Sequence, residues 1–183
     1  MARVLVPLAQ GCEELEAVSI IDLLRAGVEV VTAGLADGPV TCSRGVVIVP
    51  DVTLDDVLDG DFDMIVLPGG LPGADHLDAD ARIQRLLKQM AQQGKYTAAI
   101  CAAPKVLASA GLLQGRQATS YPGVVDAMGL ADTRYLDQSV VTDGKVITSR
   151  GLGTAMDFAL ELIEKLVGAA QRQTVEASLV RPD

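Results

Sequence analysis

The chain has 183 residues, which fits one domain of ordinary size, and its formal net charge is −9. Almost half of the residues are hydrophobic but there is no Trp and there are only two Phe, so Val, Ile, Leu and Ala must fill the core, as in a sheet covered on both faces. The negative charge argues against binding to nucleic-acid phosphates or an anionic membrane, and no apolar run approaches the ~20 residues of a membrane span.

The hydrophobic pattern predicts strands that alternate with helices along the chain. Buried strands are predicted at residues 4–9, 28–35, 63–67 and 97–100. Helices are predicted at residues 13–26, 80–93, 104–110 and 154–167. Short strands are predicted within residues 40–51 and at residues 139–142 and 145–149, the last two joined by a turn at Asp143-Gly144. A polar tail is expected after residue 167.

This alternation indicates βαβ units and a mostly parallel sheet with helices on both faces. Because the chain contains no internal repeat, linker or low-complexity segment, residues 1–183 are predicted to form a single doubly wound α/β domain. In such sheets, ligands bind beyond the carboxyl ends of the strands. We therefore expect four segments to meet at one edge of the sheet: residues 10–16, 68–73, 101–104 and 120–123.

Cys101 stands where the apolar run TAAI changes to the helical pattern of AAPKVLASAG. A residue at such a junction faces the open end of the sheet, and the helix amides there would lower the pKa of a thiol and favour the thiolate. Pro104 suits the first helical turn, because the backbone N–H that proline lacks would have no partner within the helix there. Cysteine is also among the most buried residue types and often serves as a small hydrophobe. The turn alone fits a nucleophile and a packing residue equally well.

Three glutamates, Glu13, Glu14 and Glu16, crowd the first turn of the first predicted helix. Carboxylates at a helix N-terminus stabilise the helix dipole, which accounts for acidic residues in general but does not require three of them. Glu13 and Glu16 are three apart and are expected to share a helical face. If that face meets Cys101, burial could protonate one carboxyl, which would then donate a hydrogen bond to the thiolate.

Pro68-Gly69-Gly70 follows a predicted strand, so its amides can approach a ligand closely. Together with the amide of Ala102, this turn could form an oxyanion hole, although a glycine pair alone also marks an ordinary turn. Neither a dinucleotide fingerprint nor a phosphate-binding loop is present, and no cofactor is expected.

The remaining candidate side chains carry weaker expectations. His76 is the sole histidine, and it is predicted to be a solvated loop residue unconnected to Cys101. Three cysteines without close pairs suit free thiols in a reducing, cytoplasmic compartment, and residues 1–7 look like a strand rather than a signal peptide. Cys42 is expected to serve packing or an interface. Cys12 precedes the glutamates and could resolve an oxidised Cys101, although a packing role is the simpler expectation.

Seven stretches, in order and over nearly the whole chain, together resemble one family: GCEELEAV, AGL, TCSRGVVIVPD, VLPGG, AAICAAP, TSRGLGTAMDFAL and VEASLV. The family is the ThiJ/PfpI superfamily, in the branch of the parkinsonism-associated protein deglycase and its bacterial relatives. The resemblance implies a flavodoxin-like fold and a homodimer. It also implies that Cys101 is the nucleophile on an elbow, that Glu16 is a protonated partner of the thiol, and that the amides of Gly70 and Ala102 hold an oxyanion. Arg44 corresponds to a residue near the dimer interface in relatives.

The activity implied by this resemblance is a cofactor-independent glyoxalase or deglycase acting on methylglyoxal-type 2-oxoaldehydes or their adducts. Many relatives have a histidine near the cysteine, where this chain has Tyr121. Tyr121 at this position argues against a Cys–His catalytic dyad. The resemblance therefore leaves Glu16 as the residue that transfers protons. Two alternatives stay open: a redox-responsive protective protein or chaperone in which Cys101 is oxidised to a sulfinate, and a binding domain with an inert buried cysteine.

Overall fold

The structure, a computed structural model that describes residues 1–181, is built on a seven-stranded sheet in the order β10-β11-β7-β6-β1-β2-β5. All neighbouring strands are parallel except the hairpin of β10 and β11. The strands are β1 (Arg3–Leu8), β2 (Glu29–Gly34), β5 (Val52–Thr53), β6 (Met64–Leu67), β7 (Tyr96–Ile100), β10 (Val140–Asp143) and β11 (Val146–Ser149). The predicted, mostly parallel sheet is thus confirmed.

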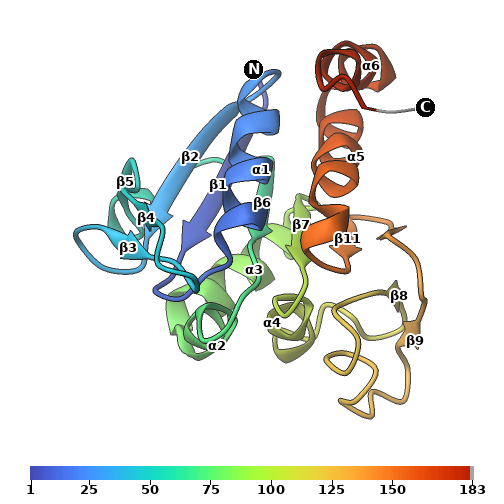
Figure 1. Cartoon of the computed structure of the whole chain (residues 1–183). Helices are drawn as coiled ribbons and strands as arrows, with labels where there is room; N and C mark the ends of the chain where they lie inside the picture. The colour runs from blue at the N-terminus through green and yellow to red at the C-terminus, as the bar shows by residue number, and fades with distance from the viewer. Residues whose placement is uncertain (182–183) are drawn as a thin grey trace.

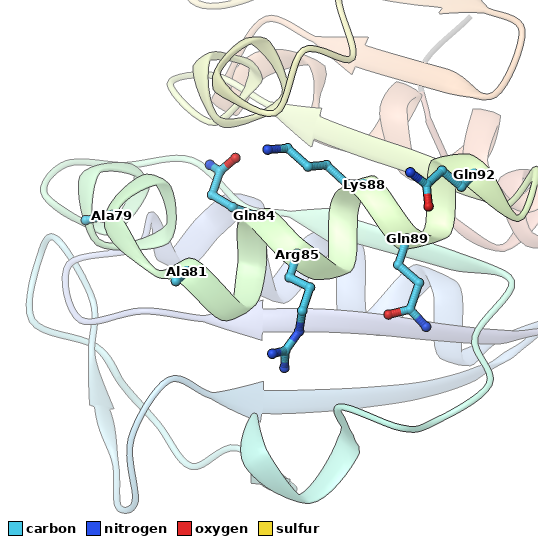
Figure 2. Close-up of a pocket in the computed structure, with 7 residues that line it drawn as sticks. All are labelled: Ala79, Ala81, Gln84, Arg85, Lys88, Gln89 and Gln92. Atoms are coloured by element: carbon cyan, nitrogen blue, oxygen red, sulfur yellow. The ribbon is translucent and has the colours of Figure 1, made fainter.

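Helices cover both faces of this sheet. On one face, α1 (Glu14–Arg25) packs beside α5 (Ala155–Val167), and α3 (Ala81–Gln92) lies on the other, as Figures 1 and 2 both show. The short α2 (Gly73–Ala79) packs on α4 (Pro104–Ser109), and α6 (Ala169–Ser178) packs on α5. This layering confirms the predicted doubly wound fold.

The core follows from the apolar patterns of these elements. Five of the six residues of β1 are buried, as expected for a strand covered on both faces. In α1, Ala17, Ile20 and Leu24 recur at helical spacing and are fully buried against the sheet and α5. Among residues 1–181, no helix is both long enough and apolar enough to cross a membrane.

Several short elements were not predicted. A two-stranded sheet pairs β3 (Val40–Thr41) with β4 (Val47–Ile48), as the pattern of residues 40–51 suggested, but β5 and the pair of β8 (Gln117–Ala118) and β9 (Arg134–Tyr135) were not expected. Two single-turn helices, η1 (Asp55–Val57) and η2 (Leu152–Thr154), were also missed. The polar tail is in fact helix α6, whose one buried residue, Val175, leaves almost no hydrophobic periodicity to detect.

The parallel register brings the carboxyl ends of the central strands to one edge. Leu67 at the end of β6 pairs with Ala99 in β7, and Ile100 at the end of β7 pairs with Ser149 at the end of β11. The segments that follow these strands therefore start side by side, as predicted. This edge carries the candidate active site.

Candidate active site

Cys101 is the first residue after β7 and adopts a left-handed backbone conformation with φ of 63°. Such a conformation costs a non-glycine residue on the order of 1–3 kcal/mol, so the surrounding structure must hold it. Two backbone hydrogen bonds do so: the Cys101 N–H donates to the Ser149 carbonyl (3.0 Å), and the Tyr121 N–H donates to the Cys101 carbonyl (2.9 Å). The cysteine thus sits on a tight strand-to-helix elbow, with its side chain 8% exposed.

Glu16 lies in the first turn of α1 and is completely buried. The Glu13 carboxylate caps this turn by accepting the Glu16 N–H (2.8 Å). The Gly69 N–H donates to Glu16 Oε2 (2.9 Å), whereas Oε1 is buried and has no hydrogen-bond partner among residues 1–181. Oε1 is therefore the oxygen free to carry a proton.

Gly69 lies between the carboxyl of Glu16 and Cys101. A Cβ atom on Gly69 would be 2.7 Å from Glu16 Oε2 and 2.6 Å from the Cys101 Cβ. Both groups therefore border the same small space from opposite elements, α1 and the elbow after β7. The Glu16 carboxyl and the Cys101 thiol each alter the pKa of the other, which agrees with their closeness. Glu16 Oε1 nevertheless makes no hydrogen bond within residues 1–181.

Burial controls the protonation of Glu16. It raises the pKa of this carboxyl from 4.5 to about 7, against the opposing effects of the Cys101 thiol and the Gly69 N–H. The charge of Glu13 raises it further. A neutral carboxylic acid at position 16 is thus available near pH 7, in the direction that the sequence predicted.

Cys101 departs from the expected direction. Burial, followed by the nearby Glu16 carboxylate, raises the pKa of the Cys101 thiol to about 12. A lowered pKa was expected from helix amides, but α4 is only six residues long and desolvation outweighs it. Because the carboxylate charge of Glu16 is one cause of this rise, protonation of Glu16 removes that part of it, and the two titrations depend on each other.

Two backbone amides act on the Cys101 thiol. Those of Gly70 and Ala102 both lower its pKa, because donors near the sulfur favour its charged form. Gly70 has a φ of 88°, and a Cβ there would come within 2.4 Å of the Glu13 nitrogen, so only glycine fits.

The three glutamates serve three different purposes. Glu13 caps α1, and Glu16 faces the cysteine. Glu14 accepts hydrogen bonds from Ser43 Oγ (2.9 Å) and from the Arg44 N–H (2.9 Å). Although burial opposes it, backbone and side-chain hydrogen bonds lower the pKa of Glu14, so it stays ionised and ties α1 to the β3–β4 turn.

The other candidate side chains lie apart from the elbow. His76 is exposed on α2, where its Nδ1 is 2.8 Å from the Gln10 carbonyl oxygen. Cys12 contacts Cys42, with 3.6 Å between the two sulfurs, and not Cys101. No group of three or more His, Cys, Asp or Glu within residues 1–181 could hold a metal ion.

Tyr121 and Arg150 border the elbow on its open side. They line a shallow hollow of about 450 Å³, and Arg150 forms an ion pair with Asp137 there. Arg150 was not singled out from the sequence, although it directly follows β11, whose carboxyl end lies at the same edge as that of β7. The strand-end rule could have found it.

A larger hollow of about 750 Å³ runs along the exposed side of α3 (Figure 2). Its lining consists of small, amide and basic side chains from the end of α2 and from α3, and Figure 2 shows Lys88 and Arg85 extending to opposite sides of the helix. It contains neither a cysteine nor a carboxylate, so it lacks the residue types of the candidate active site.

The chain is similar to characterised proteins over almost all of its length. The sequence profile of the DJ-1/PfpI family matches residues 2–165. The Danio rerio Parkinson disease protein 7 homolog is 43% identical over 99% of this chain and 98% of its own. The Caenorhabditis elegans glutathione-independent glyoxalase DJR-1.2 is 41% identical over 99% of this chain and 94% of its own.

Solved structures agree with the sequence comparisons. Drosophila melanogaster DJ-1beta has a TM-score of 0.95 and 42% identity, covering 100% of this chain and 99% of that chain. Toxoplasma gondii DJ-1, in a structure described as oxidized, has a TM-score of 0.94 and 43% identity, covering 100% of both chains. With this fold, this degree of identity and the family profile, the chain belongs to the DJ-1/PfpI family.

Proposed function

We propose that this protein is a cysteine-dependent glyoxalase or deglycase that acts, without a cofactor, on methylglyoxal-type 2-oxoaldehydes or their adducts. The observation that carries the proposal is the pairing of Cys101 on its elbow with Glu16, a buried carboxyl whose pKa is about 7. A glyoxalase among the relatives at 41% identity supports the same reaction class.

In the proposed reaction, the Cys101 thiolate attacks the aldehyde carbon and forms a hemithioacetal. The amides of Gly70 and Ala102 hold the resulting oxyanion, since they already favour the charged form of the sulfur. Glu16 moves a proton from C1 to C2, which converts the hemithioacetal into the thioester of a 2-hydroxy acid. Water then releases the hydroxy acid and the free thiol, so the net change is the addition of one water to the 2-oxoaldehyde.

Conversion of methylglyoxal to lactate, in buffer without glutathione, tests this proposal. Wild type should turn over, Cys101→Ser should fall to the buffer rate, and Glu16→Gln should lose most activity because an amide can donate but cannot relay protons. Matched controls are Cys42→Ser and Glu14→Gln, which remove a thiol and a carboxyl outside the proposed machinery and should retain turnover. Thiol-independent turnover in wild type would rule the proposal out.

A second candidate is a redox-responsive protective protein in which Cys101 is oxidised to a sulfinate. The oxidized structure of a relative at 43% identity favours it, as do two amides and a protonated acid that could hydrogen-bond sulfinate oxygens. Peroxide treatment followed by intact-mass measurement should show the gain of two oxygens on Cys101. A Cys101 that stays a thiol would remove this candidate.

We also propose that the protein works as a homodimer in a reducing, cytoplasmic compartment. All three cysteines are free thiols. Exposed apolar side chains lie on α1 and on the β3–β4 hairpin, which Glu14 holds together, and these residues are Leu15, Val18, Val46, Val47 and Val49. An apolar patch of this kind typically marks an interface.

A further inference from the structure

Two buried cysteines that the proposed reaction does not use lie side by side. The sulfurs of Cys12 and Cys42 are 3.6 Å apart, and the residues are 0% and 4% exposed. Cys12 belongs to the loop between β1 and α1, and Cys42 directly follows β3. The two thiols therefore connect segments that are 30 residues apart in the sequence.

Main-chain hydrogen bonds on both sides hold these two segments together. The Gly11 N–H donates to the Thr41 carbonyl (2.8 Å), and the Ser43 N–H donates to the Cys12 carbonyl (2.8 Å). The Cys42 N–H is bonded in turn to the Val46 carbonyl (2.8 Å) within the hairpin. The backbone thus fixes the two side chains against each other, independently of any bond between the sulfurs.

The loop that carries Cys12 is packed so tightly that the residue cannot move away. A Cβ on Gly73 would lie 2.5 Å from the Cys12 nitrogen, and a Cβ on Gly70 would lie 2.8 Å from its carbonyl carbon. Since sulfurs in a disulfide are about 2.05 Å apart, the two thiols need to approach by about 1.5 Å, which side-chain rotation with small backbone shifts can supply.

We propose that Cys12 and Cys42 form a second redox site, separate from Cys101, which hydrogen peroxide converts from a dithiol to a reversible disulfide. The more exposed Cys42 attacks a peroxide oxygen as the thiolate, giving a sulfenic acid and one water. Cys12 then attacks that sulfur, forming the S–S bond and releasing a second water. Two thiols lose two electrons and two protons, and the peroxide is reduced to two waters.

The surroundings make this site slow to react. Burial raises the pKa of both thiols, and the nearby charges of Glu13 and Glu14 raise it further. The thiolate fraction is therefore small near pH 7, and the pair stays reduced until peroxide accumulates. Once formed, the disulfide adds a covalent link between the β3–β4 turn and the residue before Glu13.

The Cys101→Ser variant tests the proposal because it removes the third thiol as a partner. After peroxide treatment, the protein is denatured, free thiols are alkylated, and the chain is digested without reductant for mass spectrometry. We expect a cross-linked peptide that joins Cys12 to Cys42 and weighs two hydrogens less than its reduced halves. Dithiothreitol should return both thiols. The same treatment of Cys12→Ser/Cys101→Ser and Cys42→Ser/Cys101→Ser should give no cross-link.

The wild-type protein is treated and mapped in the same way, so that the proposal can be tested even if a variant does not fold. A cross-link between Cys12 and Cys42 in wild type supports the proposal by itself. Alkylation of both thiols even at peroxide doses far above the one that oxidises Cys101 would overturn it. A Cys12–Cys101 cross-link, or Cys42 sulfinate beside an alkylated Cys12, would also overturn it, because either shows that Cys12 does not capture the Cys42 sulfenic acid.

Discussion

Gly69 connects the two reactive groups of the candidate site. Its N–H donates to Glu16 Oε2, and its lack of a side chain leaves room for Cys101 to stand beside the carboxyl. A Cβ at this position would also come within 2.7 Å of the Ile100 carbonyl oxygen. Because this oxygen belongs to the backbone, no side-chain rotation can relieve the clash. The distance between acid and thiol therefore depends on this glycine.

We predict that Gly69→Ala lowers thiol-dependent turnover about 10²-fold, because a displacement near 1 Å at a reacting group has an effect of that size. The comparison is Gly153→Ala, whose added Cβ meets nothing within 4 Å and which should retain wild-type stability. Turnover and melting temperature of both variants check this. Wild-type turnover in a folded Gly69→Ala protein would show that the spacing is not critical.

Glu16 also makes stability depend on pH. Its pKa is about 7 in the folded protein and 4.5 for an ordinary carboxyl, so the folded state binds more protons between these values. The free energy of unfolding should therefore fall as pH rises from 4.5 through 7, by at most about 3 kcal/mol. Urea unfolding between pH 4.5 and 8 should show this fall in wild type and a smaller one in Glu16→Gln. Parallel curves for the two proteins would contradict the assignment.

Helix α1 shows how one element joins separate functions. Its first turn holds the cap residue Glu13, the hairpin-binding Glu14 and the buried Glu16, and its later turns fill the core against α5. The sequence shows these three acids as one cluster, and it predicts that one of them acts as the proton partner of Cys101. The resemblance pointed to Glu16, but only the packing of α1 against Gly69 shows why its neighbours cannot take its place.

Helix α6 stabilises the molecule by docking on α5. Val175 is 4% exposed, and the Arg172 guanidinium pairs with Glu164 (2.6 Å). Gln171 Nε2 donates to the Ala26 carbonyl (3.1 Å) at the end of α1. The helix thus connects the C-terminal part of the chain with its first helix.

We predict that Val175→Ala lowers the free energy of unfolding by about 1–3 kcal/mol, since it opens a cavity beneath α6. Val180→Ala, at a residue 88% exposed, should change it by about 0.5 kcal/mol or less. Urea denaturation at pH 6 measures both. Equal effects would mean that α6 contributes little to folding.

At the level of the whole molecule, parallel topology explains why the site lies where it does. The strands β6, β7 and β11 all end at one edge, and the loop after β1 reaches the same edge. Exposed apolar residues lie on α1 and on the β3–β4 hairpin, and the Cys42 N–H of the buried Cys12–Cys42 pair donates to the carbonyl of one of them, Val46. The candidate active site, the second thiol pair and the proposed dimer surface are therefore neighbours.

Val47 tests the proposed dimer because it belongs to this patch and is 57% exposed. We predict that Val47→Lys converts a dimer to a monomer, since an ammonium group would be desolvated in an apolar interface. Sedimentation velocity should show the mass halved, whereas Val180→Lys, outside the patch, should stay dimeric. A wild-type protein that sediments as a monomer would refute the proposed dimer.

The hydrophobic pattern and the turn residues predicted the central strands, the longer helices and the meeting of strand ends. These elements each bury several residues at a regular spacing, which is the pattern that a sequence shows most clearly. The pattern failed for α2 and α6, because a seven-residue helix and a helix with a single buried side chain carry too little of it. It also failed for β5, β8 and β9, two-residue strands that exist only because a partner strand lies beside them.

By itself, the sequence determined the α/β class and the candidates for the site, Cys101, Glu16, Gly70 and Ala102, since these depend on local pattern and motif. Only the tertiary structure decided their protonation: burial of both groups raises the pKa of the acid to about 7 and that of the thiol to about 12. It also decided that Cys12 pairs with Cys42 rather than facing Cys101. Desolvation and through-space contact depend on which elements pack together, and residue spacing along a chain does not contain that information.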